Sequence, residues 1–483
     1  MKKLDENFIF GVAISGFQAE GGFNGPGEPA NNWERFERTG RVETSGIGVG
    51  WWERIEEYLD LAQSLGVDMV RLGIEWARIE PREGEYDTEA ISKYRAMMQG
   101  CLDRGMKPMI TLHHFTHPNW LGEDFWLDSD SPERFAQFAQ RIVPELKEYC
   151  THWVTLNEIN ALSMATYLFS LFPPARSFAF GQAQTSSANL LNAHVKAYEI
   201  IHSSQPEATV HTNTAEVSIY ELNRMLIDTL MARRFGIKRD DLESWLISRK
   251  AQWYGSIEKP NPLESLARKA TATAYAKLAA KQGGAQHSKK ERAMENLLDS
   301  IYSSEFESTM DVIGFDFYDP VSANHVSIPG QKTSGGRNWS LAKPLWDDGP
   351  NPKSLERYCK SLWQLYNETP VWVIENGMCS RVKDGISHPR IDGWDRPRYL
   401  RENISAVIDA MDKGADIKGY LHWSLVDNYE WGSYQPRFGL YGIDRERGCK
   451  IMKTDAQGHD AGETYKRIIA GLKSGDFSVL RAQ

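Results

Sequence analysis

The stretch "ERIEEYLDLAQSLGVDMVRLGIEW", residues 53–76, combines the two periodicities that decide the fold. Its first half carries apolar residues at helical spacing, namely Ile55, Tyr58, Leu59, Ala62 and Leu65. Its second half, from Val67, is a short run that is apolar on both faces, as in a strand covered on both sides. A helix followed by such a strand is the repeating unit of a parallel sheet covered by helices.

Runs of this kind occur eight times along the chain. They are "FIFGVAIS" (8–15), "VDMVRLGIEW" (67–76), "KPMITLHHF" (107–115), "HWVTLNEI" (152–159), "TVHTNTAEVSIY" (209–220), "DVIGFDFY" (311–318), "PVWVIENG" (370–377) and "IKGYLHWSL" (417–425). Amphipathic helical segments separate them, and no linker or low-complexity tract divides the 483 residues. The pattern predicts an α/β fold, a single-domain (β/α)₈ TIM barrel.

One long interruption, residues 221–302, lies between the fifth and sixth expected strands and is helical and heavily charged. We interpret it as an insertion within the barrel domain and expect a solvated helical excursion. A role in oligomer contacts and a role in covering the active-site mouth are the alternatives.

Composition excludes several classes of protein. With 56 basic and 65 acidic residues the net charge is -9, which disfavours a nucleic-acid partner and fits a neutral or cationic small molecule better. No run is long enough for a membrane span or a secretory leader. The five cysteines are few and scattered, which argues against a disulfide framework and a zinc knuckle. A soluble, cytoplasmic protein is expected.

Polar side chains collect at the carboxyl ends of the expected strands, where a barrel of this kind builds its active site. In chain order they are Gln18 and Glu20, Arg71 and Glu75, His113, His114 and His117, Asn157 and Glu158, Asp316 and Tyr318, Glu375 and Asn376, and His422, Trp423, Asp427 and Glu430. A purely structural barrel would not need them, because buried polar groups cost stability unless each finds a partner.

Two glutamates end strands that are otherwise strongly apolar, Glu158 in "WVTLNE" and Glu375 in "VWVIEN". The fourth and seventh strands lie on opposing parts of the ring, so both carboxylates could face one cavity. Glycoside hydrolysis uses such a pair: one carboxyl protonates the leaving oxygen, and the other attacks or supports the anomeric carbon. The alternative is a pair of structural carboxylates held by ion pairs near Arg71.

Nearby aromatic residues favour a sugar as the ligand. A saccharide pocket combines aromatic platforms for the C–H faces with carboxylate and amide partners for the hydroxyl edges. The segment "LHWSLVDNYEWGSYQPRFG", residues 421–439, supplies both, with Trp423, Glu430 and Trp431 as candidates. Taken singly, each tryptophan is more often a packing residue than a platform.

Four motifs, "RLGIEWARIEP" (71–81), "TLNEIN" (155–160), "VIENG" (373–377) and "YLHWSLVDNYEW" (420–431), resemble glycoside hydrolase family 1 in order and spacing. The likeness covers nearly the whole chain and is greatest to the archaeal-type β-glycosidases. It implies an exo-acting, retaining β-glycosidase that removes terminal β-glucosyl or β-galactosyl units and needs no metal or cofactor.

By this resemblance Glu158 is the acid/base and Glu375 the nucleophile, with Arg71 and Tyr318 stabilising the charge of Glu375. Asn157 would hold the sugar's 2-hydroxyl. Neighbours on a regular strand point to opposite faces, so we expect the backbone to leave strand geometry at Asn157 and Glu158. A retaining mechanism places the two carboxyl groups about 5 to 5.5 Å apart.

The resemblance also implies contacts to the non-reducing sugar from Gln18, His114 and Glu430, with Trp431 beside them and Trp423 beneath the ring. In the branch of the family that acts on 6-phosphorylated sugars, the carboxylate at the position of Glu430 is replaced, because it would repel the phosphate. Here it is kept, and "GSYQPRFG" (432–439) lacks the lysine expected there. Unphosphorylated substrates are therefore expected.

Three features depart from the family pattern. "HHFTHP" puts Phe115 where a tryptophan is usual, which leaves the hydroxyl edge with one donor fewer. "DFY" puts Asp316 where an amide is usual, and its carboxylate would either raise the pKa of Glu158 or alter hydration near the leaving group. The helical insertion is the third departure.

Two further residue patterns have competing interpretations. "HHFTH" (113–117) allows a metal site, but His113 and His114 alternate across a strand and should point apart. Cys379 follows the seventh strand without a partner pattern, and a buried inert thiol is expected.

Two other functions stay open at this point. A transglycosylase would use the same double displacement but pass the sugar to another sugar or a lipid headgroup. A sugar-binding protein without catalysis is disfavoured, because both glutamates are present. The expected partner is a small-molecule β-glycoside, and the sequence leaves open whether the chain forms a homo-oligomer.

Overall fold

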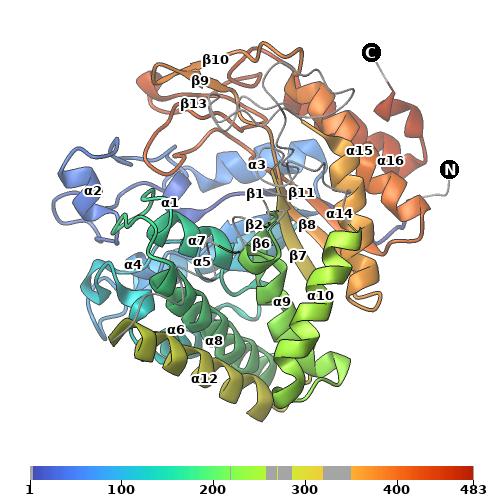
Figure 1. The fold of residues 1–483 in the computed structure, drawn as a ribbon. Coiled ribbons are helices and arrows are strands. Elements are labelled where there is room, and N and C mark those ends of the chain that lie inside the picture. Colours follow the sequence, from blue (N-terminus) through green and yellow to red (C-terminus); the bar gives the residue numbers. More distant parts are fainter. Residues whose placement is uncertain are drawn as a thin grey trace.

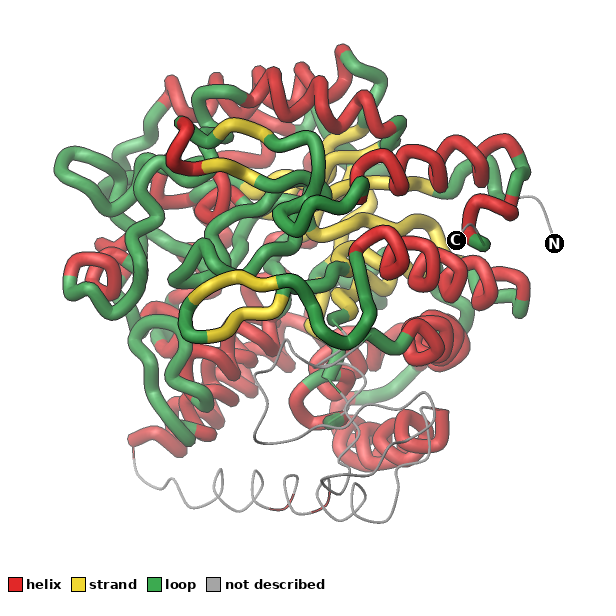
Figure 2. The backbone as a smooth tube through the Cα atoms, turned by 90° about the horizontal axis from the view of Figure 1, so that it is seen from above, coloured by secondary structure: helices red, strands yellow, loops and turns green. Residues whose placement is uncertain are grey.

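The computed structural model describes residues 4–217, 219–256, 285–318 and 350–481, together with Lys269 and Thr273. Its parallel strands form one sheet in the order β5-β4-β3-β2-β1-β11-β8-β7-β6. They are β1 (Ile9–Ala13), β2 (Met69–Gly73), β3 (Lys107–Thr111), β4 (His152–Val154), β5 (Thr209–His211), β6 (Asn213–Ala215), β7 (Ile313–Phe317), β8 (Val371–Asn376) and β11 (Ile417–Trp423). Helices surround this ring of strands, which makes the fold a (β/α)₈ TIM barrel, as predicted (Figures 1 and 2).

The expected fifth strand is divided at Thr212, so the structure has nine strands where the sequence predicts eight. β5 pairs with β4, and β6 pairs with β7. Thr212, between them, donates its hydroxyl to the carbonyl of Leu156 at 2.7 Å, which takes it out of the regular ladder. β5 and β6 together are the expected fifth strand and close the ring at the expected place, so the nine strands of the sheet make an eight-stranded barrel, as predicted.

Helices connect the strands and cover the outside of the barrel. In the described parts of the chain they are α1 (Gly16–Ala19), α2 (Glu34–Arg38), α3 (Ile55–Leu65), α4 (Trp76–Ile79), α5 (Thr88–Asp103), α6 (Ser131–Leu146), α7 (Ile159–Tyr167), α8 (Phe180–Ser204), α9 (Arg224–Met231), α10 (Leu242–Ser256), α12 (Ala285–Ser303), α14 (Pro352–Leu365), α15 (Arg396–Asp412) and α16 (Ala461–Ser474). No helix in these parts is long and apolar enough to cross a membrane.

Two short hairpins lie outside the barrel sheet, β9 (Arg381–Lys383) with β10 (Ile386–His388) and β12 (Ile443–Asp444) with β13 (Lys450–Ile451). The sequence patterns do not predict them, because their strands have only two or three residues.

The helix at residues 55–65 forms as expected. The side chains of Tyr58, Leu59, Ala62 and Leu65 are buried. Gly66 then adopts a left-handed conformation with φ 77°, which ends the helix before β2.

The inside of the barrel is filled by apolar side chains beneath the polar rim. This layer consists of Met69, Met109, Val154, Val312, Trp372, Ile374 and Leu421. Met69 precedes Arg71 by two residues on β2, so both face the interior and Arg71 lies nearer the carboxyl end. The polar rim therefore rests on a dry apolar layer.

The described part of the insertion is helical, as expected, and consists of α9, α10 and α12. Figure 1 shows α12 lying along α8, with which it makes extensive contact. The charged segment "ESLARKATATAYAKLAAKQGG", residues 264–284, lies outside the described residues except for Lys269 and Thr273. Its role in oligomer contacts or in covering the mouth stays a prediction.

Closure of the barrel leaves no room for a side chain at Gly314 on β7. A Cβ there would lie 2.4 Å from the His211 ring on β5. We predict that Gly314→Ala lowers the free energy of unfolding by about 1–3 kcal/mol through overpacking. Urea unfolding followed by circular dichroism measures this. The control is Gly255→Ala on α10, where a Cβ would meet nothing within 4 Å; equal unfolding midpoints for the two variants would contradict the prediction.

Candidate active site

The backbone leaves strand geometry at Asn157 and Glu158, as predicted. β4 ends at Val154, and Glu158 adopts a left-handed conformation with φ 39° and ψ 61° directly before α7. This turn lets two consecutive side chains face the barrel axis, which a regular strand forbids.

A second irregularity positions Glu375. Phe315 of β7 pairs with Val373, but Asp316 pairs with Glu375, so β8 has one extra residue over this span. The pairing of β8 with β11 shifts at the same place. Such a bulge redirects side chains. Ile374 can therefore belong to the apolar interior layer while the adjacent Glu375 lines the cavity above it.

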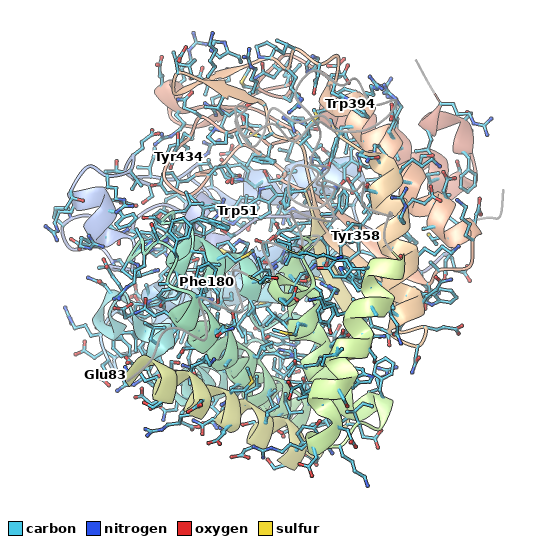
Figure 3. The ribbon with its side chains drawn as sticks, viewed as in Figure 1. Trp51, Glu83, Phe180, Tyr358, Trp394 and Tyr434 are labelled. Carbon is cyan, nitrogen blue, oxygen red and sulfur yellow. The ribbon has the colours of Figure 1, made fainter. Side chains whose placement is uncertain are left out.

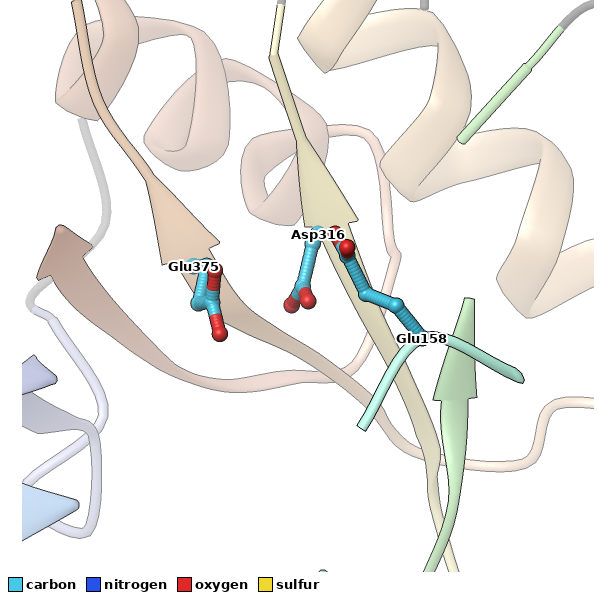
Figure 4. Close-up of side chains that lie close together, drawn as sticks. All are labelled: Glu158, Asp316 and Glu375. Atoms are coloured by element: carbon cyan, nitrogen blue, oxygen red, sulfur yellow. The ribbon is translucent and has the colours of Figure 1, made fainter. Parts of the chain in front are cut away.

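Three buried carboxyl groups meet above the apolar layer, those of Glu158, Asp316 and Glu375. They come from the turn after β4, from β7 and from β8, and Figure 4 shows them converging. Carboxylate oxygens of all three lie within 4.8 Å of one another. Glu158 and Glu375 therefore stand close together, and the separation of about 5 to 5.5 Å between their carboxyl groups stays a prediction.

Arg71 on β2 connects two of the predicted site residues. Its Nη1 donates to Glu375 Oε1 at 2.5 Å, and its Nη2 donates to Asn157 Oδ1 at 2.5 Å. Thr111 accepts from Arg71 Nε at 2.9 Å and fixes the guanidinium plane. Tyr318 donates its hydroxyl to the other oxygen of Glu375 at 2.8 Å. Both oxygens of Glu375 thus receive donors that favour its charged form.

The surroundings of Glu158 and Glu375 act differently on the pKa values of these two glutamates. Burial and the neighbouring Glu375 raise the pKa of Glu158 to about 8. Burial also raises the pKa of Glu375, but Arg71 and the Tyr318 hydroxyl act against this rise. A pKa of about 8 keeps Glu158 largely protonated at neutral pH, while the donors on Glu375 favour its charged form.

Asp316 lies between hydrogen-bond partners that suit a neutral carboxylic acid. Its Oδ2 accepts from Asn213 Nδ2 at 2.5 Å, and its Oδ1 is buried without a donor among the described residues. Burial, Glu375 and Glu158 raise its pKa well above the usual value. These surroundings disfavour the charged form of Asp316, whose carboxyl group also hydrogen-bonds to Glu158.

Aromatic rings and hydrogen-bonding groups stand next to the carboxyls. Trp423 Nε1 and Gln18 Nε2 donate to the two oxygens of Glu430 at 3.1 and 3.2 Å. The His114 ring is nearly parallel to the rings of both Trp423 and Trp431, with centroid distances of 5.7 and 5.8 Å. These residues, which the sequence predicts at the ends of the first, third and last strands, line one cavity.

This cavity has a volume of about 270 Å³. The described residues that line it are Gln18, His114, Phe115, Glu158, Ala161, Met164, Ala165, Phe169, Leu171, Phe172, Ala215, Glu216, Asp316, Tyr318, Glu375, Trp423, Glu430, Trp431 and Phe438. Asn157 and Arg71 lie next to this lining: Arg71 binds both Asn157 and Glu375, and Asn157 Nδ2 lies 3.2 Å from His114 Nε2. Phe115 is buried against Trp431, with ring centroids 4.9 Å apart, and adds an apolar wall to the pocket.

Several polar rim residues that the sequence analysis names do not line the cavity. Glu20 pairs with Arg78 and Asp427 pairs with Arg437. The others that stay outside are Glu75, His113, His117, Asn376 and His422, all of them buried. These residues support the rim from behind.

The sequence analysis missed the contribution of the fifth strand. Asn213 on β6 donates to Asn157 Oδ1 at 3.0 Å as well as to Asp316, and its own Oδ1 accepts from the backbone N–H of Glu158 at 3.3 Å. Glu216, just after β6, lines the cavity and is paired with Arg224. Asn213 and Glu216 stand at the carboxyl end of "TVHTNTAE", where a barrel places its active-site residues, so the sequence contains the signal for both.

His113 packs edge-on against Trp126 while His114 lies in the cavity, so the two rings point apart as expected. In the described part of the chain, Glu158, Asp316 and Glu375 are the three side chains close enough to share a metal ion. Arg71 and Asn213 already occupy oxygens of two of them. Burial raises the pKa of the Cys379 thiol to about 12, consistent with an inert group.

Comparisons with known proteins agree with this geometry. A sequence profile of glycosyl hydrolase family 1 matches residues 1–470. A 6-phospho-beta-galactosidase of Clostridium acetobutylicum is 27% identical, over 99% of this chain and 99% of that protein. A beta-galactosidase of Sulfolobus acidocaldarius is 26% identical, over 92% of this chain and 91% of its own. The fold is also similar to that of a family 1 b-glucosidase from Thermotoga maritima in complex with isofagomine lactam, with a TM-score of 0.71, 21% identity and coverage of 98% and 99% of the two chains. The chain therefore belongs to glycosyl hydrolase family 1 and is a glycosidase.

Proposed function

We propose that the protein is an exo-acting, retaining β-glycosidase that hydrolyses terminal β-glucosyl or β-galactosyl residues. One observation carries this proposal: an oxygen of Glu158 lies within 4.8 Å of an oxygen of Glu375 in one cavity. Burial raises the pKa of Glu158 to about 8, and Arg71 and Tyr318 favour the charged form of Glu375. A short separation leaves no room for a water between the sugar and Glu375, which is the arrangement of retaining enzymes.

In the first step Glu375 attacks the anomeric carbon while the bond to the leaving oxygen breaks and Glu158 donates its proton to that oxygen. Arg71 and Tyr318 keep Glu375 ionised and oriented for this attack. Asn157 would hold the sugar's 2-hydroxyl. Arg71 and Asn213 fix the orientation of the Asn157 amide by donating to its Oδ1.

In the second step a water attacks the glycosyl-enzyme ester and Glu158 accepts its proton. Esterification removes the negative charge of Glu375, which is one of the causes that raise the pKa of Glu158. The same residue therefore changes from acid to base without moving. Asp316, as a neutral donor, stabilises Glu158 while it is a carboxylate.

The sugar that remains on the enzyme would bind Gln18, His114 and Glu430, with Trp431 beside it and Trp423 beneath its ring. Neither lysine nor arginine occurs among the described residues that line the cavity. A 6-phosphate bound there would lose its hydrating water without gaining a cationic partner, which is unfavourable. We therefore propose unphosphorylated substrates, although several relatives are named for phosphorylated ones.

Transglycosylation shares both chemical steps and differs only in the acceptor. The side of the cavity next to α7 is apolar, with Ala161, Met164 and Ala165. This lining admits an organic acceptor, so the ratio of transfer product to released sugar has to be measured. A binding protein without catalysis is disfavoured because both carboxyls stand in place.

We predict that Glu375→Ala lowers kcat more than about 1,000-fold, because no other group can form the ester. Sodium azide should restore turnover of an activated aryl glycoside and give the α-glycosyl azide. In Glu158→Ala, azide should instead give the β-glycosyl azide. The matched control is Glu83→Ala at the molecular surface (Figure 3), and wild-type turnover in either catalytic variant would overturn the assignment.

The pKa of about 8 for Glu158 predicts that kcat/KM falls as the pH rises through about 8, because the acid must be protonated. Glu158→Ala should lose this alkaline limb with a dinitrophenyl glycoside, whose leaving group needs no proton. Initial rates from pH 5 to about 10 measure both profiles. An unchanged limb in the variant would show that another group titrates there.

Asp316→Asn is predicted to keep activity within about tenfold of wild type, because an amide N–H can replace the carboxylic acid as donor to Glu158. Asp316→Leu, which cannot donate, should lose about 100-fold or more in kcat. Steady-state kinetics on the same aryl glycoside decide the point. A large loss in Asp316→Asn would mean that the carboxyl itself moves a proton.

For unphosphorylated p-nitrophenyl β-glucoside and β-galactoside, kcat/KM should be at least about 100-fold higher than for their 6-phosphates. The reason is that burying one unpaired charge weakens binding by about this factor. Parallel assays of the four compounds test this. A preference for either phosphorylated compound would contradict the proposed substrate class.

A further inference from the structure

Glu75 does not line the cavity, but it lies between two segments that do. The side chain is buried, 2% exposed, and stands between β2 and α4. In the sheet β2 lies between β1 and β3. The segment that follows β2 therefore has the segments that follow both neighbouring strands beside it, and a side chain placed there can reach both.

One oxygen of the Glu75 carboxyl group binds the segment after β1, and the other binds the segment after β3. The backbone N–H of Phe17 donates to Glu75 Oε1 at 2.7 Å, and the Thr116 hydroxyl donates to Glu75 Oε2 at 2.7 Å. Phe17 directly precedes Gln18, and Thr116 follows His114 by two residues. Gln18 and His114 both line the cavity. One buried side chain therefore holds the backbone next to two residues that are expected to bind the sugar.

Glu75 is itself fixed in place. Its backbone N–H donates to the Tyr94 hydroxyl at 3.1 Å, and Tyr94 donates to Glu20 at 2.9 Å. Glu20 in turn pairs with Arg78. A Cβ at Gly16 would lie 2.6 Å from Glu75 Cγ, so the start of α1 packs directly against this side chain. The carboxyl group is therefore a rigid anchor for the segments that it binds.

The position of the two oxygens of Glu75 matters more than its charge. Burial and the neighbouring Glu20 raise the pKa of Glu75 to about 8, so the surroundings disfavour the charged form. An amide offers the same oxygen to the Phe17 N–H, and the Thr116 hydroxyl can accept from an amide nitrogen as well as donate. Glu75→Gln should therefore keep both connections, whereas Glu75→Leu removes both.

We propose that Glu75 is a positioning residue for sugar binding, which holds the segments after β1 and β3 so that Gln18 and His114 reach the sugar together. This inference rests on the proposed function and assigns a part in it to a residue outside the cavity. A displacement of about 1 Å at a contact to the substrate can lower the rate about 100-fold. Loss of an anchor shared by two such contacts should therefore be visible in kcat/KM.

The test measures kcat/KM for p-nitrophenyl β-glucoside and β-galactoside. Glu75→Leu should lower it about 100-fold, and Glu75→Gln should stay within about threefold of wild type. The matched control is Glu80→Leu at the other end of α4. Glu80 is also buried outside the cavity lining, and it accepts from Trp76 Nε1 at 2.7 Å and from the Gly84 N–H at 2.9 Å. Glu80→Leu should lower the thermal unfolding midpoint as Glu75→Leu does but leave kcat/KM unchanged; an equal loss of kcat/KM in both would overturn the positioning role.

Combined variants show through which residues Glu75 acts. In a protein that already carries Gln18→Ala and His114→Ala, Glu75→Leu should cost less than about threefold more. Thr116→Val keeps the shape of the side chain and removes one of the two bonds, so it should cost about tenfold. This cost should disappear in a His114→Ala background and persist in a Gln18→Ala background. Thr116→Val also provides the test if Glu75→Leu does not fold.

Failure of this inference differs from failure of the proposed function. Wild-type kcat/KM in Glu75→Leu, or losses that multiply in full with those of Gln18→Ala and His114→Ala, would overturn the positioning role and leave the proposed function standing. A wild-type protein that hydrolyses neither glycoside would overturn the proposed function and this inference with it.

Discussion

One buried guanidinium organises the centre of this molecule. Arg71 binds the carboxylate of Glu375 and the amide of Asn157 with its two terminal nitrogens, and Thr111 fixes its plane. Three carboxyl groups lie close together around this single cation, so they cannot all be charged at once. The ion pair with Arg71 favours the charged form of Glu375, while burial and the neighbouring carboxyls raise the pKa of Glu158 and of Asp316. The chemical roles in the proposed mechanism follow from that difference.

The fold supplies the geometry through two departures from regular strand structure. A left-handed residue at Glu158 and an extra residue in β8 at Ile374 bring polar side chains to the axis that alternation would send outward. Both departures stand above the layer of buried apolar side chains inside the barrel. Low polarity beneath the site strengthens every charge interaction in it, which is why burial is the largest cause of the raised pKa of Glu158.

The sequence predicted much of this because the chemistry is concentrated in motifs at strand ends. Alternation alone indicated that Asn157 and Glu158 could not both face the cavity from a regular strand, and the turn found there confirms it. The division of the fifth strand at Thr212 was not predictable, because its side-chain bond to Leu156 depends on the closed ring. Asn213 was overlooked although it stands at a strand end like the others.

The account depends most directly on Glu375 forming the bond to the sugar. Incubation with an activated 2-deoxy-2-fluoro-β-glucoside, followed by proteolysis and mass spectrometry of the peptides, tests this claim. The account predicts one fluorosugar ester on the peptide that carries Glu375, formed at the rate at which activity is lost. A label on Glu158 or Asp316, or inactivation without a covalent adduct, would contradict it.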